Sequence, residues 1–288
     1  MRAVMRSDSA ALCAQFQELH REGCFVIPNP WDIGSALYLQ RLGFRALATT
    51  SSGLAFSRGL PDTDWAVPRD LVLSHIAEIA QAADLPVNAD FESGYSHDPE
   101  GVAENVTLCT GTGVAGLSIE DATGDAEKPL YDLPLAVERI QAARTAIDAT
   151  GRGVLLTARA ECFLVGHADP LNESIRRLQA YSEAGADVLY APGPRSRDNI
   201  RTLVQAVSPK PLNLLMGNNS ELRTSDLAEL GVRRISVGSG LARAAFTGFI
   251  RAAKLIAQEG SFAGFEGVVP FSELNQFFRE ELKKRSQP

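Results

Sequence analysis

The segment VNADFESGY, residues 87–95, ends an apolar stretch with one amide and two acids. Side chains of a strand alternate between its two faces, so we expect Asn88 and Asp90 to point the same way. Glu92 follows just past the strand end. Polar groups that gather where a buried strand stops indicate a site.

More acids stand at or just after the ends of other apolar segments, namely Asp62 or Asp64, Glu120, Asp121 and Glu161. Such a rim of acids with no matching lysine is self-repelling unless a cation is bound or several groups are protonated. Oxygen ligands of this kind suit Mg²⁺ or Mn²⁺. We therefore predict a divalent metal here, with helix capping or simple solvent exposure of the acids as the alternative.

Arg159 ends the apolar segment 153–159, so we expect its guanidinium in the same mouth. Its fork of donors suits a substrate carboxylate or an enolate oxygen. A structural role as the partner of Glu120 or Glu161 is the alternative. The small residues 51–54 (SSGL) end another strand, where their backbone N–H groups can hold an oxyanion, although SSG is also common in ordinary turns.

These residues need elements that bring strand ends together. Short apolar segments alternate with amphipathic ones, and no linker divides the chain. The predicted strands are 24–28, 45–50, 85–90, 115–121, 153–159, 186–192, 211–216 and 233–239. The predicted helices include 32–43, 69–83, 134–148, 170–185 and 241–260. Eight strand-helix units favour an α/β fold of the (β/α)8 TIM barrel type, whose catalytic groups come from the strand ends, and a doubly wound open sheet is the alternative.

Two segments lie outside the eight units. Residues 8–22 are predicted to form a helix that plugs the bottom of the barrel. Residues 271–285 are predicted to form an extra C-terminal helix whose apolar face is too large for a free tail. We therefore expect a barrel over 1–260 and a helical extension over 261–288 that packs on the barrel or on a neighbouring subunit.

Composition narrows the classes of function. The chain has 288 residues and a net charge of −7, which argues against nucleic-acid and polybasic membrane surfaces. The four cysteines show no CxxC spacing, as in a reduced cytosolic protein. Because we find neither a signal-peptide pattern nor an apolar run of about 18 residues, we expect a cytoplasmic protein with a small-molecule partner.

Five segments in order are similar to the isocitrate lyase and phosphoenolpyruvate mutase superfamily. They are NPWDIGSA (29–36), TTSSGL with GLPD (49–54 and 59–62), NADFESGY (88–95), SIED (118–121) and TARAE (157–161). The resemblance covers about residues 20–250. It implies a barrel enzyme that forms or consumes a pyruvate-like enolate while carbon–carbon or phosphorus–carbon bonds are cleaved or rearranged.

The resemblance also implies roles for residues. Ser52, Gly53 and Leu54 match the stretch that holds the 2-oxoacid or enolate end of the substrate. The predicted substrate-binding residues are Trp31, Asp32, Ser52, Gly53, Leu54, Asn88 and Arg159, and the predicted catalytic residues are Arg159, Asp62 and Ser52. The predicted metal residues are Asp90, Glu120 and Asn88, with Asp90 contacting Mg²⁺ directly or through water.

The chain departs from the family pattern in two places. Asn88 replaces the first acid of Asp-x-Asp, which removes one negative charge from the metal shell, although an amide oxygen can still coordinate. The loop DATGDAEKPLYD, residues 121–132, lacks the Lys-x-Cys-Gly-His of isocitrate and methylisocitrate lyases, and Lys128 is its only basic residue. The proton donor is therefore unassigned.

These features predict a Mg²⁺-dependent carbon–carbon lyase that acts on a small 2-hydroxy or 2-oxo carboxylic acid through a pyruvate-like enolate. The alternatives are a decarboxylase or hydrolase of an oxaloacetate-type 2-oxoacid, phosphorus–carbon chemistry, or a barrel that binds a 2-oxoacid without turnover. The resemblance and the apolar helix 271–285 predict a homodimer or homotetramer with exchanged C-terminal helices.

One glycine-rich motif has two interpretations. VGSGLAR, residues 237–243, could cradle a phosphate with help from MGNNS, residues 216–220. Because the resemblance places the substrate at the metal and Arg159, we interpret VGSGLAR as a tight turn of the barrel.

Overall fold

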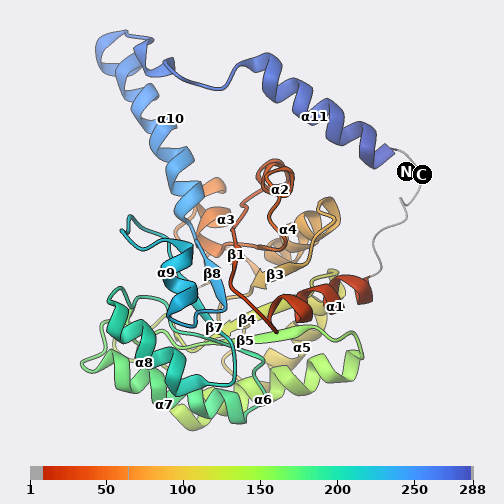
Figure 1. Cartoon of the computed structure of the whole chain (residues 1–288), viewed down its shortest axis with the longest axis vertical. Coiled ribbons are helices and arrows are strands. Elements are labelled where there is room, and N and C mark those ends of the chain that lie inside the picture. Colours follow the sequence, from red (N-terminus) through yellow and green to blue (C-terminus); the bar gives the residue numbers. More distant parts are fainter. Residues whose placement is uncertain (1–8, 64, 287–288) are drawn as a thin grey trace.

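The computed structural model describes residues 9–63 and 65–286. Eight parallel strands in this part of the chain form a nearly closed barrel, in the order β1-β8-β7-β6-β5-β4-β3-β2 (Figure 1). The strands are β1 (Phe25–Ile27), β2 (Leu47–Ala48), β3 (Val87–Asp90), β4 (Gly116–Glu120), β5 (Leu155–Arg159), β6 (Val188–Tyr190), β7 (Leu212–Leu215) and β8 (Arg234–Ser236). Each lies inside the range predicted for it.

The barrel closes between its first two strands. The backbone N–H of Ala48 at the end of β2 donates to the carbonyl of Pro28, just after β1, at 3.0 Å. β1 also pairs in parallel with β8, so the first and last strands of the sequence are neighbours in the barrel. The predicted (β/α)8 barrel is therefore confirmed, and the doubly wound open sheet is excluded.

Most of the helices follow a strand and cover the outside of the barrel. The helices of the described residues are α1 (Ser9–Leu19), α2 (Ile33–Arg41), α3 (Ser51–Ser57), α4 (Arg69–Ala82), α5 (Pro99–Gly111), α6 (Leu133–Thr150), α7 (Pro170–Glu183), α8 (Arg197–Val207), α9 (Thr224–Glu229), α10 (Gly240–Glu259) and α11 (Phe271–Ser286). A 3₁₀ turn, η1 (Ala263–Phe265), lies between the last two.

Helix α1 lies against the amino-terminal ends of the strands, as predicted for residues 8–22 apart from residue 8, which lies outside the described part. Nε2 of Gln17 donates to the carbonyl of Gly153, before β5, at 2.8 Å. Phe16 is fully buried, and its ring passes so close to Gly116 that a Cβ there would lie 2.7 Å from Cε1 of Phe16. The glycine at the start of β4 therefore makes room for the plug.

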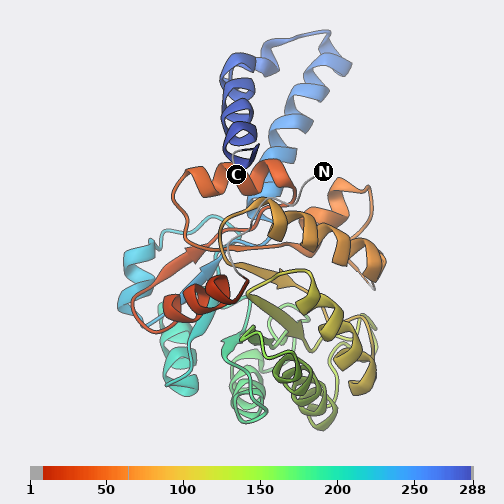
Figure 2. The same ribbon diagram turned by 90° about the vertical axis from the view of Figure 1, so that its right-hand side faces the viewer.

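Helix α10 leaves the barrel after its first turn, so it does not cover the strands as the other long helices do (Figure 2). Ala242 is the buried residue of this 20-residue helix. α11 returns and packs on α2 of the same chain, where the ring centroids of Tyr38 and Phe277 lie 5.2 Å apart and Arg41 pairs with Glu281 at 2.9 Å. The projecting part of the chain thus begins inside α10. The division into a barrel over 1–260 and an extension over 261–288 remains a prediction.

The search for membrane-spanning segments gives a simple result. None of the helices in residues 9–63 and 65–286 is both long and apolar enough to cross a membrane.

Candidate active site

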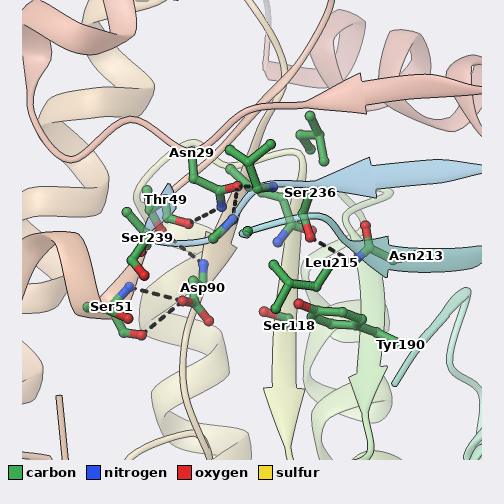
Figure 3. Close-up of a pocket in the computed structure, with 18 of the residues that line it drawn as sticks. Asn29, Thr49, Ser51, Asp90, Ser118, Tyr190, Asn213, Leu215, Ser236 and Ser239 are labelled. Atoms are coloured by element: carbon green, nitrogen blue, oxygen red, sulfur yellow. Dashed lines mark hydrogen bonds between the residues drawn. The ribbon is translucent and has the colours of Figure 1, made fainter. Parts of the chain in front are cut away.

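The carboxyl ends of the strands surround a cavity of about 380 Å³. It is lined from both halves of the barrel, by Asn29 after β1, Asp90 in β3 and Tyr190 in β6. Figure 3 shows these side chains together with Ser51 and Ser236 around a common space. This is the end of the barrel at which (β/α)8 enzymes carry their catalytic groups.

The first residues of α3 hold two of the predicted acids. Oδ2 of Asp90 accepts the backbone N–H of Ser51 at 2.9 Å and the Ser51 hydroxyl at 3.0 Å. The Ser52 hydroxyl donates to Oδ2 of Asp62 at 2.6 Å. Two consecutive serines therefore orient an acid at the end of β3 and an acid in the loop after α3. The SSGL stretch is the start of a helix, and the N–H of Ser51 is already in use.

Arg159 lies within a cluster of acids. Its Nη1 lies 3.1 Å from Oε2 of Glu120 and 3.7 Å from Oδ1 of Asp90, and its Nε donates to Glu161. Burial alone would lower the pKa of Arg159, but the charges of Glu120 and Glu161 raise it well above its ordinary value. Arg159 is thus a permanent cation that faces the cavity, and the predicted pairing with Glu120 and Glu161 is also present.

The acids near Arg159 outnumber it. They are Asp62, Asp90, Glu92, Glu120 and Glu161. Burial raises the pKa of Asp62, Glu120 and Glu161, and it raises the pKa of Glu92 to about 7. Desolvated carboxylates that repel one another take up protons or bind a cation. The cluster therefore has the electrostatic character that the sequence predicted for a metal site.

A second cavity of about 400 Å³ adjoins the first and shares Ser51, Asp62 and Arg159 with it. Glu120 and His97 line this second space. The two cavities together place all of these acids, apart from Glu161, beside space that a small molecule or hydrated ion can enter.

The donor set decides which metal would fit. In the described part of the chain, no three His, Cys, Asp or Glu side chains are placed to hold an ion between them. A fully protein-ligated site is therefore not formed. Mg²⁺ typically uses one or two carboxylates together with waters and substrate oxygens. Asp90 and Glu120, whose carboxylates both lie near Nη1 of Arg159, fit Mg²⁺ or Mn²⁺ held in that way.

Asn88 shares a strand face with Asp90, as predicted, and both line the main cavity. Its polar atoms are already engaged. Nδ2 donates to the carbonyl of Ala89 at 3.0 Å, and Oδ1 lies 3.5 Å from Nη1 of Arg234. Coordination of a metal by Asn88 remains a prediction, and it would compete with Arg234 for the amide oxygen.

The structure brings some predicted residues together and leaves others apart. Ser52, Asp62, Asn88, Asp90 and Arg159 line the main cavity, and Glu120 lines the adjoining one. The residues that line neither cavity are Trp31, Asp32, Gly53 and Leu54. Asp64, the alternative to Asp62, lies outside the described residues.

The four residues outside the cavities have structural contacts. Oδ1 of Asp32 caps α2 by accepting the N–H of Ser35 at 2.7 Å. Leu54 is 2% exposed and belongs to the core. A Cβ on Gly53 would lie 2.8 Å from Cβ of Trp31, so the chain needs a glycine at this close approach.

Residues from the last two strands also line the cavity and were not predicted from the sequence. They are Asn213, Arg234 and Ser236, and Asn29 after β1 joins them. Strand alternation from Ile27 would have pointed Asn29 inward. Nothing in the apolar segment 233–239 marks Arg234 as an interior residue.

Comparisons with known proteins show the family to which the chain belongs. The phosphoenolpyruvate phosphomutase family model matches residues 16–257. A solved structure from Burkholderia cenocepacia, described as a lyase/mutase, is 46% identical with a TM-score of 0.89 and covers 94% of this chain and 96% of its own.

Two curated relatives have named activities. The 2-methylisocitrate lyase of Escherichia coli is 32% identical over 177 residues, which are 60% of this chain and 58% of that protein. The oxaloacetate decarboxylase of Pseudomonas savastanoi is 30% identical over 218 residues, 73% of this chain and 72% of that protein. With a family model that spans most of its barrel, the chain belongs to the phosphoenolpyruvate phosphomutase family of the isocitrate lyase superfamily.

Proposed function

We propose that the protein is a carbon–carbon lyase dependent on Mg²⁺ or Mn²⁺ that acts on a small 2-hydroxy or 2-oxo carboxylic acid through a pyruvate-like enolate. The observation that carries this proposal is the cluster of Arg159 with Asp90, Glu120 and Glu161 at the mouth of the barrel. A cation-binding set of acids and a fixed guanidinium are the two features needed to hold an α-oxygenated carboxylate and its enolate.

Asp90 and Glu120 would hold the metal, with the amide oxygen of Asn88 as a third donor. The metal would supply a positive charge that stabilises the oxygen of the enolate. Arg159 binds the carboxylate next to that oxygen through its planar donors. Ser52 orients the same end of the substrate from the cavity wall. Gly53 and Leu54 support that wall from behind by fixing the start of α3, together with Trp31 and Asp32.

The chain's own acid-base chemistry centres on the Ser52–Asp62 pair. In cleavage of a 2-oxo acid that carries a hydroxyl on C4, Asp62 accepts the hydroxyl proton, that oxygen becomes the carbonyl of the departing fragment, and the bond between C3 and C4 breaks. Its electron pair stays on the 2-oxo acid fragment as the pyruvate-like enolate, which must then gain a proton. We assign no residue to that last transfer, because the loop 121–132 has neither cysteine nor histidine.

A second candidate is decarboxylation or hydrolysis of an oxaloacetate-type 2-oxoacid. The similarity to an oxaloacetate decarboxylase over 73% of this chain favours it. In decarboxylation the same metal and Arg159 would stabilise the same enolate, and the leaving group would be CO₂ in place of a carbonyl compound. In hydrolysis water would add to the 2-oxo carbon, the bond between C2 and C3 would break, and oxalate would be released with a second carboxylate. Phosphorus–carbon chemistry would release phosphate or move a phosphoryl group, and a barrel that binds without turnover would release nothing.

We also propose a homodimer or homotetramer in which the C-terminal helices are exchanged. The projecting segment leaves large apolar side chains exposed, namely Phe249, Phe262, Phe265, Val268, Phe271 and Leu282. A patch of this kind is typical of a protein interface. We place the protein in the cytoplasm, in keeping with four cysteines that form no disulfide.

The experiment that tests the function is product detection by NMR. Purified protein is incubated with Mg²⁺ and a panel of 2-hydroxy and 2-oxo di- and tricarboxylates and phosphonopyruvate. We expect two organic fragments from one substrate, one of them a carbonyl compound. CO₂ would select decarboxylation, oxalate would select hydrolysis, and phosphate would select phosphorus–carbon chemistry. Activity that survives both Asp90→Ala and Arg159→Ala would show that the site is assigned wrongly. Ligand-dependent stabilisation with no product under any metal would favour a binding protein.

A further inference from the structure

The floor of the main cavity holds a buried cation that the proposed reaction does not use. Arg234, in β8, is 3% exposed and lines the cavity. Its Nε donates to Oδ1 of Asn213 at 2.8 Å, its Nη2 to Oγ1 of Thr157 at 3.0 Å, and its Nη1 lies 3.5 Å from Oδ1 of Asn88. All three partners are neutral.

This environment is unusual for a buried charge, which is normally paired with an opposite one. Burial lowers the pKa of Arg234 to about 10, and the neighbour that raises it is the phenol of Tyr190. Arg177, another interior arginine, differs because it pairs with Asp121 at 3.0 Å. Arg139 resembles Arg234 more closely, since it lies over the ring of Tyr131 and donates to backbone carbonyls, but it does not line the main cavity. Arg234 therefore lacks a counter-charge among its contacts.

Helix α1 and the turn after it, at the amino-terminal end of the barrel, do not supply a negative partner for Arg234. His20 of the α1 plug lies near Arg234, and burial together with the charge of Arg234 lowers its pKa to about 3. His20 is thus neutral, and its Nε2 has no hydrogen-bond partner. Because the plug supplies no negative charge, an anion for Arg234 must enter from the cavity above.

The cavity itself is divided by charge. Asp62 and Asp90 line it on the side of strands β2 and β3. On the side of β6, β7 and β8, the lining residues include no acid but two arginines, Arg234 on the floor and Arg243 on the rim. Arg243 is held by Oδ1 of Asn218 at 3.0 Å. The second half is therefore suited to a negative group.

Three amides of the glycine-rich turn VGSGLAR are already in use. The N–H groups of Val237 and Gly238 both donate to Oδ1 of Asn29, at 2.9 and 2.8 Å. The N–H of Gly240 donates to the carbonyl of Val237 at 3.0 Å. These bonds hold the turn against the end of β1, as expected for a tight barrel turn, and the guanidinium of Arg234 is the charged donor on this side of the cavity floor.

We propose that Arg234 binds a second anionic group of the substrate, a carboxylate or a phosphonate. The inference rests on the proposed function, because it assigns the far end of the molecule whose 2-oxo or 2-hydroxy end is held at Arg159. The substrate is then a compact dianion that spans the cavity of about 380 Å³ from the acidic half to the Arg234 half. Asn88 keeps Arg234 available, because an aspartate there would neutralise it from within the protein.

The test compares dianions with analogues that lack the second charged group. Malonate and succinate are titrated by calorimetry in the presence of Mg²⁺, each beside its monoamide, and phosphonoacetate is titrated beside acetate, which lacks the phosphonate. We expect the wild type to bind at least one dianion about tenfold or more tightly than its analogue, since a hydrogen-bonded charge is worth that much. Tightest binding of phosphonoacetate would identify a phosphonate, and tightest binding of a dicarboxylate would identify a carboxylate.

Two variants remove the guanidinium's effect in different ways. Arg234→Met removes the charge, and Asn88→Asp leaves Arg234 in place but pairs it. In both variants, the dianion and its uncharged-end analogue should bind about equally. The control is Arg233→Gln, a change at the neighbouring residue, whose Nη1 donates to the carbonyl of Gly23. This variant should keep the preference for the dianion. A folded Arg234→Met or Asn88→Asp protein with an undiminished preference would overturn the proposal, as would a wild type that does not discriminate.

The outcome is separable from that of the proposed function. Turnover with no effect of Arg234→Met on the dianion preference would refute the second anion site and leave the lyase intact. A dianion preference that depends on Arg234, in a protein that yields no product, would retain the anion site and refute the lyase.

Discussion

Glu120 and Arg159 are paired residues of neighbouring parallel strands, β4 and β5, and their charged atoms lie 3.1 Å apart at the mouth of the barrel. Because paired positions of neighbouring strands point to the same face, the two side chains emerge together into the cavities. The side chains of Glu120 and Arg159 are 18% and 17% exposed, so their charges are poorly screened by solvent.

Removal of Arg159 should therefore affect both stability and activity. Arg159→Gln leaves Asp90, Glu120 and Glu161 without their cation, which we expect to lower the free energy of unfolding by about 3 kcal/mol in urea titrations. kcat/KM should fall by about a hundredfold or more if Arg159 stabilises the enolate. Glu120→Gln should lower the free energy of unfolding less in the Arg159→Gln protein than in the wild type. An equal loss in the two proteins would show that Glu120 and Arg159 are not coupled.

The Ser52–Asp62 hydrogen bond should matter for turnover more than for folding. Ser52→Ala removes one donor to an acid at the cavity, and we expect kcat to fall by about ten- to a hundredfold while the free energy of unfolding changes by about 1 kcal/mol or less. Ser57→Ala in the same helix removes a hydroxyl that donates to the carbonyl of Leu54, and it serves as the matched control. An active Ser52→Ala protein would remove Ser52 from the catalytic residues.

Metal removal should give a reversible loss of activity and of thermal stability. A metal that binds only the folded chain raises stability by RT ln(1 + [L]/Kd), so adding Mg²⁺ or Mn²⁺ to chelator-treated protein should raise the melting temperature. Asp90→Asn and Glu120→Gln should each reduce that rise. Asp84→Asn, an exposed acid that lines neither cavity, should leave it unchanged. A rise that is the same in all four proteins would place the metal elsewhere.

Much of this site could be predicted because it depends on local rules. Strand alternation placed Asn88 and Asp90 on one face, and the ends of apolar segments placed Glu120 and Arg159 at one rim. Roles for Ser52 and Asp62 required the family resemblance, since their contact joins the start of α3 to a loop ten residues later. These parts of the site are close together in sequence or lie on adjacent strands.

The remaining parts depend on contacts that only the closed barrel creates. Arg234 becomes an interior residue because β8 lies between β7 and β1, and its Nη1 reaches Asn88 across the interior. Likewise, the amphipathic pattern of residues 241–260 is the same for a helix that covers a barrel and for one that projects toward another surface. Pattern alone could not distinguish the two, because it records an apolar face and not what covers it.

The exposed apolar residues of α11 predict an effect on assembly. We expect a dimer or tetramer by light scattering, and Phe271→Asp with Leu282→Asp should shift it toward smaller species because charges would be buried in the interface. Phe271 and Leu282 are 83% and 61% exposed, so neither change should unfold the barrel. Ser272→Asp adds a charge at an exposed site of the same helix and is the control. A monomeric wild type would refute the exchanged-helix assembly.

His20 predicts how stability depends on pH. Its pKa is about 3 in the folded chain, against about 6.5 when the chain is unfolded. Between these values the unfolded chain binds a proton that the folded chain does not, so stability is full above about pH 6.5 and is lost as the pH falls. At pH 5 the loss should be about 2 kcal/mol.

His20→Asn should remove that part of the acid sensitivity, since its amide can still donate to the carbonyl of Phe16, which lies 2.7 Å from Nδ1 of His20. Urea titrations at pH 7.5 and 5 measure the difference, and His167→Asn, at an exposed loop position, is the control that should behave as the wild type. An equal loss in the His20→Asn and wild-type proteins would mean that His20 does not stay neutral in the plug. It would also mean that the space beneath Arg234 can hold a second positive charge.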